Sequence, residues 1–250
     1  MSTASGRIIC IVAILLGQTF TQTSIAASIP LPVERPVHMT PKEVQKAPDP
    51  EQKPEQQYGQ IETRSKNSCL VELNKIAKAI SVSPTPPKDP ECIISNPVSI
   101  LSISIPNGTI TLPANMLNKC EFALEFTRWV ADVANPLARQ HLGSPIAKLH
   151  SGTGFTCRRR NNLPTGKLSE HAFGNAIDII GLTLKNGDRF SVEDPAGMEP
   201  SYARFFAALR KTACGYFTTV LGPGSNAAHA THLHLDLGIH GKSGNYRICE

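Results

Sequence analysis

The run Ala228-His229-Ala230-Thr231-His232-Leu233-His234-Leu235-Asp236-Leu237, near the end of this 250-residue chain, alternates polar and apolar residues over its second half. Successive side chains of a strand point to opposite faces, so His232, His234 and Asp236 would share one face. The three leucines would pack on a core from the other face. The run therefore predicts a strand over 231–237 that presents two imidazoles and a carboxylate. A solvent-exposed face with incidental histidines is the alternative.

A second polar cluster lies upstream, in Ser169-Glu170-His171-Ala172-Phe173-Gly174-Asn175-Ala176-Ile177-Asp178. On a continuous helix, His171 and Asp178 would lie roughly 10 Å apart along the axis. Two donors to one zinc ion lie only some 3 to 4 Å apart. A turn at Gly174-Asn175, followed by a strand over 176–180, would bring the imidazole and the carboxylate together. Alternatively, Asp178 caps or hydrogen-bonds a neighbouring loop. Together the two clusters offer the ligand types of a catalytic zinc site.

The N-terminal segment predicts export. Arg7 precedes an apolar run over 8–16, and small residues up to Ala27 follow, which is typical of a cleavable signal peptide over 1–27. An uncleaved membrane anchor is the alternative, although the run is short for a bilayer span. Because no later segment is apolar enough to span, we expect a mature protein without a transmembrane segment, in the periplasm or secreted.

Six cysteines lie outside this segment, and in an exported protein they predict three disulfides, with Cys249 tying the C-terminus to the domain. A thiolate zinc site is the alternative, but it is disfavoured because the chain has no C-x-x-C pair. The spacing leaves the pairing open among Cys69, Cys92, Cys120, Cys157, Cys214 and Cys249.

Prolines recur among Lys, Glu and Gln over 28–66. Such a segment buries too little apolar surface to offset the entropy of ordering it, so it predicts a disordered linker. The linker is either a spacer that lets the domain reach away from a membrane or partner, or a tail without a function.

The folded domain is expected over 67–250. Apolar residues at helical spacing predict helices over 69–80, 114–134 and 201–214, and Pro136 should end or bend the second. Strands are expected over 98–103, 109–112, 146–150, 176–180, 217–221 and 231–237. Because helices and strands do not alternate regularly, the predicted fold class is α+β.

The formal net charge of +5 at pH 7 is modest. The basic residues are spread out, apart from Arg158-Arg159-Arg160, and export also argues against a nucleic-acid partner. A polyanionic or a neutral cell-wall substrate is compatible with this charge.

The pattern Ser169-x-His171-x-x-Gly174-x-Ala176-x-Asp178, followed by His232-x-His234, resembles the zinc site of a superfamily that unites lysostaphin-type peptidases, D-alanyl-D-alanine peptidases and Hedgehog domains. From Cys69 to Cys249 the chain more closely resembles the bacterial extensin-like protein C-terminal domain. The motifs of that likeness are Cys157-Arg158-x-Arg160-Asn161, Leu168-Ser169-Glu170-His171, Gly174-Asn175-Ala176-Ile177-Asp178, Leu221-Gly222-Pro223-Gly224 and His232-x-His234-Leu235-Asp236. The resemblance implies a Hedgehog/DD-peptidase-like single domain with a small antiparallel sheet flanked by helices.

The resemblance also implies a metal centre. It makes His171, Asp178 and His234 the ligands of Zn²⁺, with a fourth position left for water. In the superfamily an arginine before this motif contacts the substrate or the developing oxyanion. Arg158 or Arg160 could accordingly make this contact, and both are predicted substrate-binding residues. Ser169 is a further predicted substrate-binding residue. A solvated basic strand end is the alternative for the arginines.

At the position of the catalytic base, this chain differs from one branch of the superfamily. D-alanyl-D-alanine dipeptidases carry a glutamate three residues before the last zinc histidine, where this chain has Thr231. The arrangement His229-x-x-His232-x-His234 instead resembles the penicillin-insensitive murein endopeptidases. His232 is therefore predicted to orient or deprotonate the zinc water, assisted by His229, since the pKa of imidazole lies near neutrality.

These residues lead to two expectations for function. The first is an exported zinc-dependent hydrolase that cleaves peptide bonds in peptidoglycan with zinc-activated water, as an endopeptidase or a carboxypeptidase. The second is a non-catalytic, zinc-containing binding module of the cell envelope, because Hedgehog domains keep their zinc and act as ligands. The sequence leaves open the bond cleaved and the oligomeric state.

Overall fold

The fold was taken from a computed structural model, which describes residues 68–83, 86–114, 116–193 and 199–250. The predicted signal peptide and Pro-rich linker lie outside the described residues. Within the described ranges, no helix combines the length and the apolar character that a bilayer span needs.

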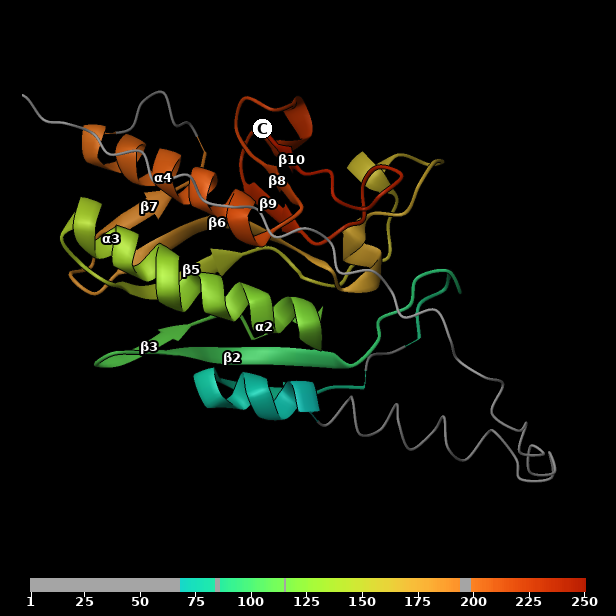
Figure 1. The fold of residues 1–250 in the computed structure, drawn as a ribbon, viewed down its shortest axis with the longest axis horizontal. Helices are drawn as coiled ribbons and strands as arrows, with labels where there is room; N and C mark the ends of the chain where they lie inside the picture. Colours follow the sequence, from blue (N-terminus) through green and yellow to red (C-terminus); the bar gives the residue numbers. More distant parts are fainter. Residues whose placement is uncertain (1–67, 84–85, 115, 194–198) are drawn as a thin grey trace, which may run out of the picture. The chain divides into compact units, whose positions relative to one another are not determined.

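Ten strands of the described chain form one mixed sheet (Figure 1). They are β1 (Ala77–Ser81), β2 (Pro97–Ile105), β3 (Gly108–Thr111), β4 (Leu117–Lys119), β5 (Ile146–Ser151), β6 (Ala176–Leu184), β7 (Arg189–Ser191), β8 (Thr219–Leu221), β9 (Leu233–Asp236) and β10 (Ile248–Cys249). Their order is β1-β2-β3-β5-β6-β9-β8-β10, with β4 beside β2 and β7 beside β6. Because β3 pairs with β5 and β8 with β10 in parallel, the prediction of a small antiparallel sheet is wrong in size and in direction, whereas the α+β class is confirmed.

The long helix begins later and ends later than its sequence pattern predicts. It comprises α2 (Cys120–Trp129), a π-helical turn (Val130–Ala134) and α3 (Asn135–Leu142) without interruption. Residues before Cys120 form β4 instead, because they pair with β2. Pro136 does not end the helix: the widened π turn directly precedes it and gives the chain room for the proline ring and its missing N–H. Gly143, at φ 70°, ends α3.

The first predicted helix ends earlier than expected. Among the described residues, 68–76 are helical, and the chain then continues as β1. Ile80 has the right spacing for the helix face but lies on β1 and is 49% exposed. Strand pairing with β2 therefore overrides the helical periodicity at this point. The third helix, α4 (Pro200–Tyr216), is confirmed with slightly wider bounds.

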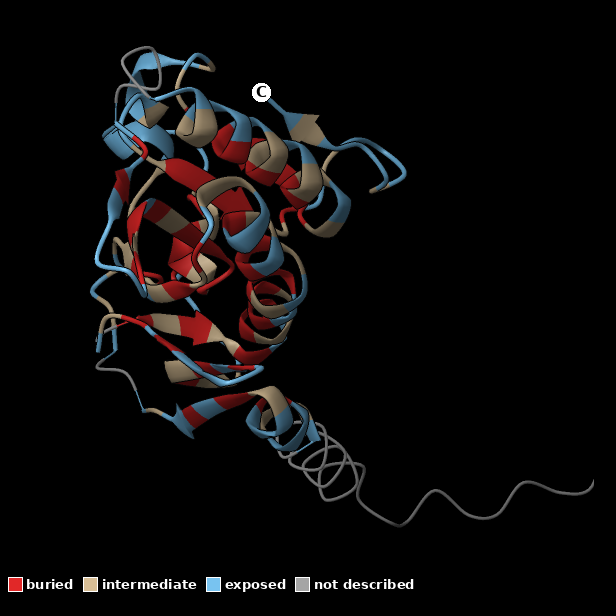
Figure 2. Cartoon of the chain, turned by 90° about the vertical axis from the view of Figure 1, so that its left-hand side faces the viewer, coloured by how far each residue is buried: buried red, intermediate tan, exposed pale blue. Residues whose placement is uncertain are grey.

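The core lies between the helices and the sheet, where Figure 2 shows the buried residues gathered. Its centre is aromatic: Trp129 of the long helix meets the ring of Phe217 edge-on, with centroids 5.6 Å apart. Leu233 and Leu235 of β9 are completely buried in the same core. In Figure 1, α3 and α4 lie side by side over the same face of the sheet, which we call the inner face. The opposite face is called the outer face.

Three disulfides confirm the prediction from the cysteine count. Cys69 pairs with Cys120, Cys92 with Cys157 and Cys214 with Cys249. The second bond anchors the segment that carries Arg158. The third attaches the C-terminus to α4, as predicted for Cys249.

Candidate metal centre

Two neighbouring strands bring the predicted ligands together on the outer face. β6 and β9 are antiparallel, and Asp178 stands directly opposite His234 in their register. Their neighbours Ile177, Ile179, Leu233 and Leu235 point inward to the core. The predicted alternation is therefore correct, although β9 begins only at Leu233 and His232 precedes it. His234 and Asp236 are themselves buried, so a solvent-exposed strand face is the wrong interpretation for them.

The predicted turn between His171 and Asp178 also forms. His171 lies in a short 3₁₀ helix (Glu170–Phe173), whose first turn is capped by the Ser169 hydroxyl accepting the His171 N–H. Gly174 ends that helix at φ 61°, the left-handed region that glycine adopts without strain. A Cβ at this position would also lie 2.8 Å from the Lys119 nitrogen. The chain then reverses into β6 and carries Asp178 back towards His171.

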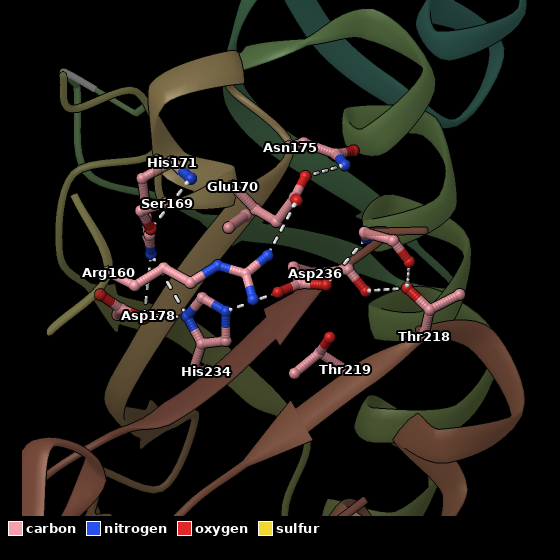
Figure 3. Close-up of polar contacts among 12 residues, drawn as sticks. Arg160, Ser169, Glu170, His171, Asn175, Asp178, Thr218, Thr219, His234 and Asp236 are labelled. Carbon is pink, nitrogen blue, oxygen red and sulfur yellow. Dashed lines mark hydrogen bonds and ion pairs between the residues drawn. The ribbon is translucent and has the colours of Figure 1, made fainter. Parts of the chain in front are cut away.

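The three side chains converge (Figure 3). Asp178 Oδ1 lies 2.8 Å from His234 Nδ1 and 3.3 Å from His171 Nε2, and these two ring nitrogens are 3.3 Å apart. The two histidine side chains are buried, and that of Asp178 is 18% exposed. Three zinc donors, each about 2 Å from the ion, would stand at similar mutual separations.

The other ring nitrogens are held by fixed acceptors. His171 Nδ1 lies 2.7 Å from the Gly154 carbonyl oxygen, and His234 Nε2 lies 2.9 Å from Asp236 Oδ2. With the proton of each neutral ring on the nitrogen that meets such an acceptor, the lone pair is on His171 Nε2 and His234 Nδ1, which face Asp178. Acceptors orient histidine ligands in the same way in known metal sites. A Cβ on Gly154 would clash with the Leu117 carbonyl oxygen, so this close approach requires glycine. The donor set and its supports fit a zinc ion.

Hydrogen bonds between Asp178 and the histidines keep both Asp178 and His234 charged at pH 7, although the two side chains are largely buried. Burial would raise the pKa of Asp178, but hydrogen bonds to His171 and His234 hold it well below its usual range. Burial opposes a charge on His234, yet its hydrogen bonds to Asp178 and Asp236 raise its pKa to about 9. In the metal-free protein, a proton on His234 thus lies where a cation would otherwise bind.

The two predicted catalytic histidines lie beside this centre. His232 Nε2 is 3.5 Å from Asp178 Oδ1, and its side chain is 18% exposed. The His229 ring lies 5.2 Å from the His232 ring and 5.4 Å from the His234 ring, between centroids. Burial and the neighbouring histidines lower the pKa of His229 to about 4, and burial lowers that of His232. Both rings are therefore neutral at pH 7.

The predicted substrate-binding residues take different positions. Arg158 Nη2 lies 3.8 Å from Asp178 Oδ2, at the open side of the cluster. Arg160 Nη2 lies 3.8 Å from Glu170 Oε1, and Arg159 points instead to Asp89 and Glu91. A pocket of about 190 Å³ adjoins the centre and is lined by Arg158, Arg160, Asn161, Ser169, Glu170, Thr219, Leu221, Asn226, His229, His234, Asp236, His240 and Ile248. Ser169 lines the pocket, but it is buried and its hydroxyl oxygen accepts the hydrogen bond that caps the 3₁₀ helix.

Several supporting residues were not assigned a role from the sequence. Asp236 shares the predicted strand face with His234, so the alternation alone could have identified it as the partner of that ring. Glu170 accepts a hydrogen bond from the Asn175 amide at 2.7 Å and holds the turn before β6. Gly154 carries no signal of its function in the sequence, because its partner His171 is distant in the chain.

Replacing Asp236 with asparagine is expected to weaken zinc binding by about 10- to 100-fold. Asparagine can still accept from His234 Nε2 but carries no charge to increase the basicity of the ring. Affinity would be measured by competition with a chromophoric chelator. Asp188→Asn, at an exposed carboxylate between β6 and β7, is the matched control. Unchanged affinity in Asp236→Asn would show that the carboxylate does not support a metal ligand.

Comparisons with known proteins place the chain by family alone. Residues 67–250 match the family model described as extensin-like protein C-terminus. No curated protein and no solved structure matches the chain. The match covers most of the chain and all of the described metal centre, so the chain belongs to the family of the extensin-like protein C-terminus.

Proposed function

We propose that this protein is an exported, zinc-dependent hydrolase that cleaves peptide bonds in peptidoglycan, with a fold related to the Hedgehog and D-alanyl-D-alanine peptidase domains. The observation that carries the proposal is the convergence of His171, Asp178 and His234, whose ring nitrogens are oriented by Gly154 and Asp236. Three disulfides support export, because such bonds persist in oxidising compartments.

The residues around the centre suit hydrolysis. Zinc held by the three side chains would polarise a substrate carbonyl and lower the pKa of a water molecule. His232 is neutral at pH 7 and can accept a proton beside Asp178. His229 can assist, because Nδ1 donating to Asn226 Oδ1 at 2.8 Å leaves its Nε2 as an acceptor. Arg158 offers a guanidinium to a developing oxyanion at the open side of the cluster.

Metal analysis and hydrolysis by the mature chain test this proposal together. We expect about one zinc ion per chain and release of stem peptides from purified peptidoglycan. A chelator should abolish the release and added zinc should restore it. A preparation with intact disulfides that contains no zinc, or that releases peptides equally well with chelator, would contradict the proposal.

A non-catalytic binding module of the cell envelope is the second candidate. The observation in its favour is Thr231, an exposed residue at the position where the dipeptidase branch carries a carboxylate base. Such a module would keep its zinc and its affinity for cell-wall peptides but would show no turnover.

A further inference from the structure

A hollow lies on the outer face beyond the metal centre, on β5, β6 and β7. It has a volume of about 670 Å³ and is lined by His150, Ile180, Gly181, Leu182, Arg189, Phe190, Ser191, Glu193 and Thr231. Thr231 directly precedes His232, and Ile180 lies two residues after Asp178 on the same face of β6. The hollow is thus continuous with the surface that carries the metal centre.

The strand register explains which side chains face this hollow. The pairing of β5 with β6 is irregular: His150 pairs with Gly181 and Ser151 with Ile179, so Ile180 is an extra residue of β6. The alternation of side chains on β6 shifts at this bulge, and both Asp178 and Ile180 before it and Gly181 and Thr183 beyond it face outward. His150 pairs with Gly181, Lys148 pairs with Thr183, and Thr183 pairs with Arg189 on its other side. Paired residues share a face. Lys148, His150 and Arg189 therefore lie on the outer face together.

Positive charge dominates this part of the outer face. Lys148 and Arg189 are exposed, and neither makes an ion pair with any residue in the described ranges. Both are close enough to His150 to lower the pKa of its ring, after the larger effect of burial. Glu193 contributes one opposing carboxylate to the lining. The lining of the hollow thus carries one permanent cation, Arg189, and one carboxylate, and Lys148 adds a second unpaired cation beside the hollow on the same face of β5.

The distance from the metal centre suits a peptide. Gly181 lies three positions after Asp178 along β6, and Thr183 lies five positions after it. At about 3.3 Å per residue these positions are roughly 10 and 16 Å away. An extended peptide advances at nearly the same rate, so its third to fifth residues from the metal centre would reach the hollow and Lys148 beside it.

We propose that Lys148, His150 and Arg189 form a subsite that binds a carboxylate of an extended peptide, three to five residues from the bond held at the metal centre. The inference rests on the proposed function, because it assumes that this peptide is the substrate. It deepens that function by assigning specificity for acidic peptides.

Peptide binding by the zinc-loaded protein tests the subsite. The probes are two fluorescein-labelled, cross-linked stem peptides that differ only in having free carboxylates or carboxamides on their acidic residues. Fluorescence anisotropy on mixing, at low salt, reports the dissociation constants. We expect the wild-type protein to bind the acidic peptide about tenfold more tightly than the amidated one, and the preference to shrink as salt is added.

The double variant Lys148→Gln/Arg189→Gln should reduce that preference to about twofold or less, with affinity for the amidated peptide unchanged. Arg204→Gln/Lys211→Gln removes the same two charges from exposed positions of α4 and should keep the preference. Equal binding of the two peptides by the wild-type protein, a preference retained in the double variant, or no binding of either peptide would overturn the subsite. Because this measurement needs no turnover, a catalytically silent protein would contradict the hydrolase but not the subsite.

Discussion

Replacing Asp178 with alanine is expected to abolish zinc binding, reducing the metal content from about one ion per chain to none. Its Oδ1 atom lies within 3.5 Å of the nearest nitrogens of His171, His232 and His234. Without it, the centre loses its only anionic donor and keeps the guanidinium of Arg158 nearby. Affinity should fall by on the order of 10³-fold or more, because zinc would have to bind at neutral donors beside a cation.

Zinc content after desalting and chelator competition would measure this loss. Asp178→Asn keeps the volume and removes the charge, so it should also lose the metal and exclude a packing defect as the cause. Asp188→Ala, at an exposed carboxylate, is the control that should keep zinc. Thermal unfolding of each variant should be compared with the wild-type protein in chelator. One zinc ion per chain in a folded Asp178→Ala protein would remove the basis of the metal centre.

Replacing His232 with alanine is expected to lower kcat for stem-peptide release by about 10²- to 10⁴-fold, while zinc content stays near one ion per chain. The reason is its position: the ring lies beside Asp178 and is neutral, yet it is not one of the three converging donors. Steady-state release of peptides at saturating substrate, together with metal analysis of the same sample, measures both quantities.

The matched control is His141→Ala, at a partly buried histidine of α3 on the inner-face helix layer. It should change neither kcat nor zinc content. If His232→Ala loses zinc, His232 is a ligand rather than a base. If the wild-type protein has no turnover, and the His232→Ala variant binds stem peptides as tightly as the wild-type protein, the protein is a binding module.

The convergence at the candidate metal centre could be predicted in part from the sequence, because two of its signals are local. The alternation around His234 requires one strand with two faces, and Gly174 supplies the reversal that lets His171 approach Asp178. The supports of the centre were less accessible. Gly154 orients His171 through a carbonyl oxygen, and every residue has one, so no residue type marks that contact.

The elements that the sequence predicted wrongly are those whose conformation depends on distant partners. Ala77 and Ile80 continue a helical pattern, but they pair with β2 and become a strand. Pro136 should break a regular helix, but a π turn before it absorbs the change. The sheet is mixed because β3 pairs with β5 and β10 with β8 in parallel, and the short strands of these pairs give no sign of their partners.

The sequence by itself determined the α+β class, the six paired cysteines and the two faces of β9. Each of these follows from residue type and short-range spacing, which set the direction of a side chain and the shape of a turn. The choice of the three candidate ligands came instead from the resemblance of their motifs to a known zinc site. Only the tertiary structure decided the disulfide pairing, the order of the strands and the outer-face neighbours of the centre, including Lys148 and Arg189. These depend on which distant segments pack together, and that choice minimises the free energy of the whole core rather than of any one segment.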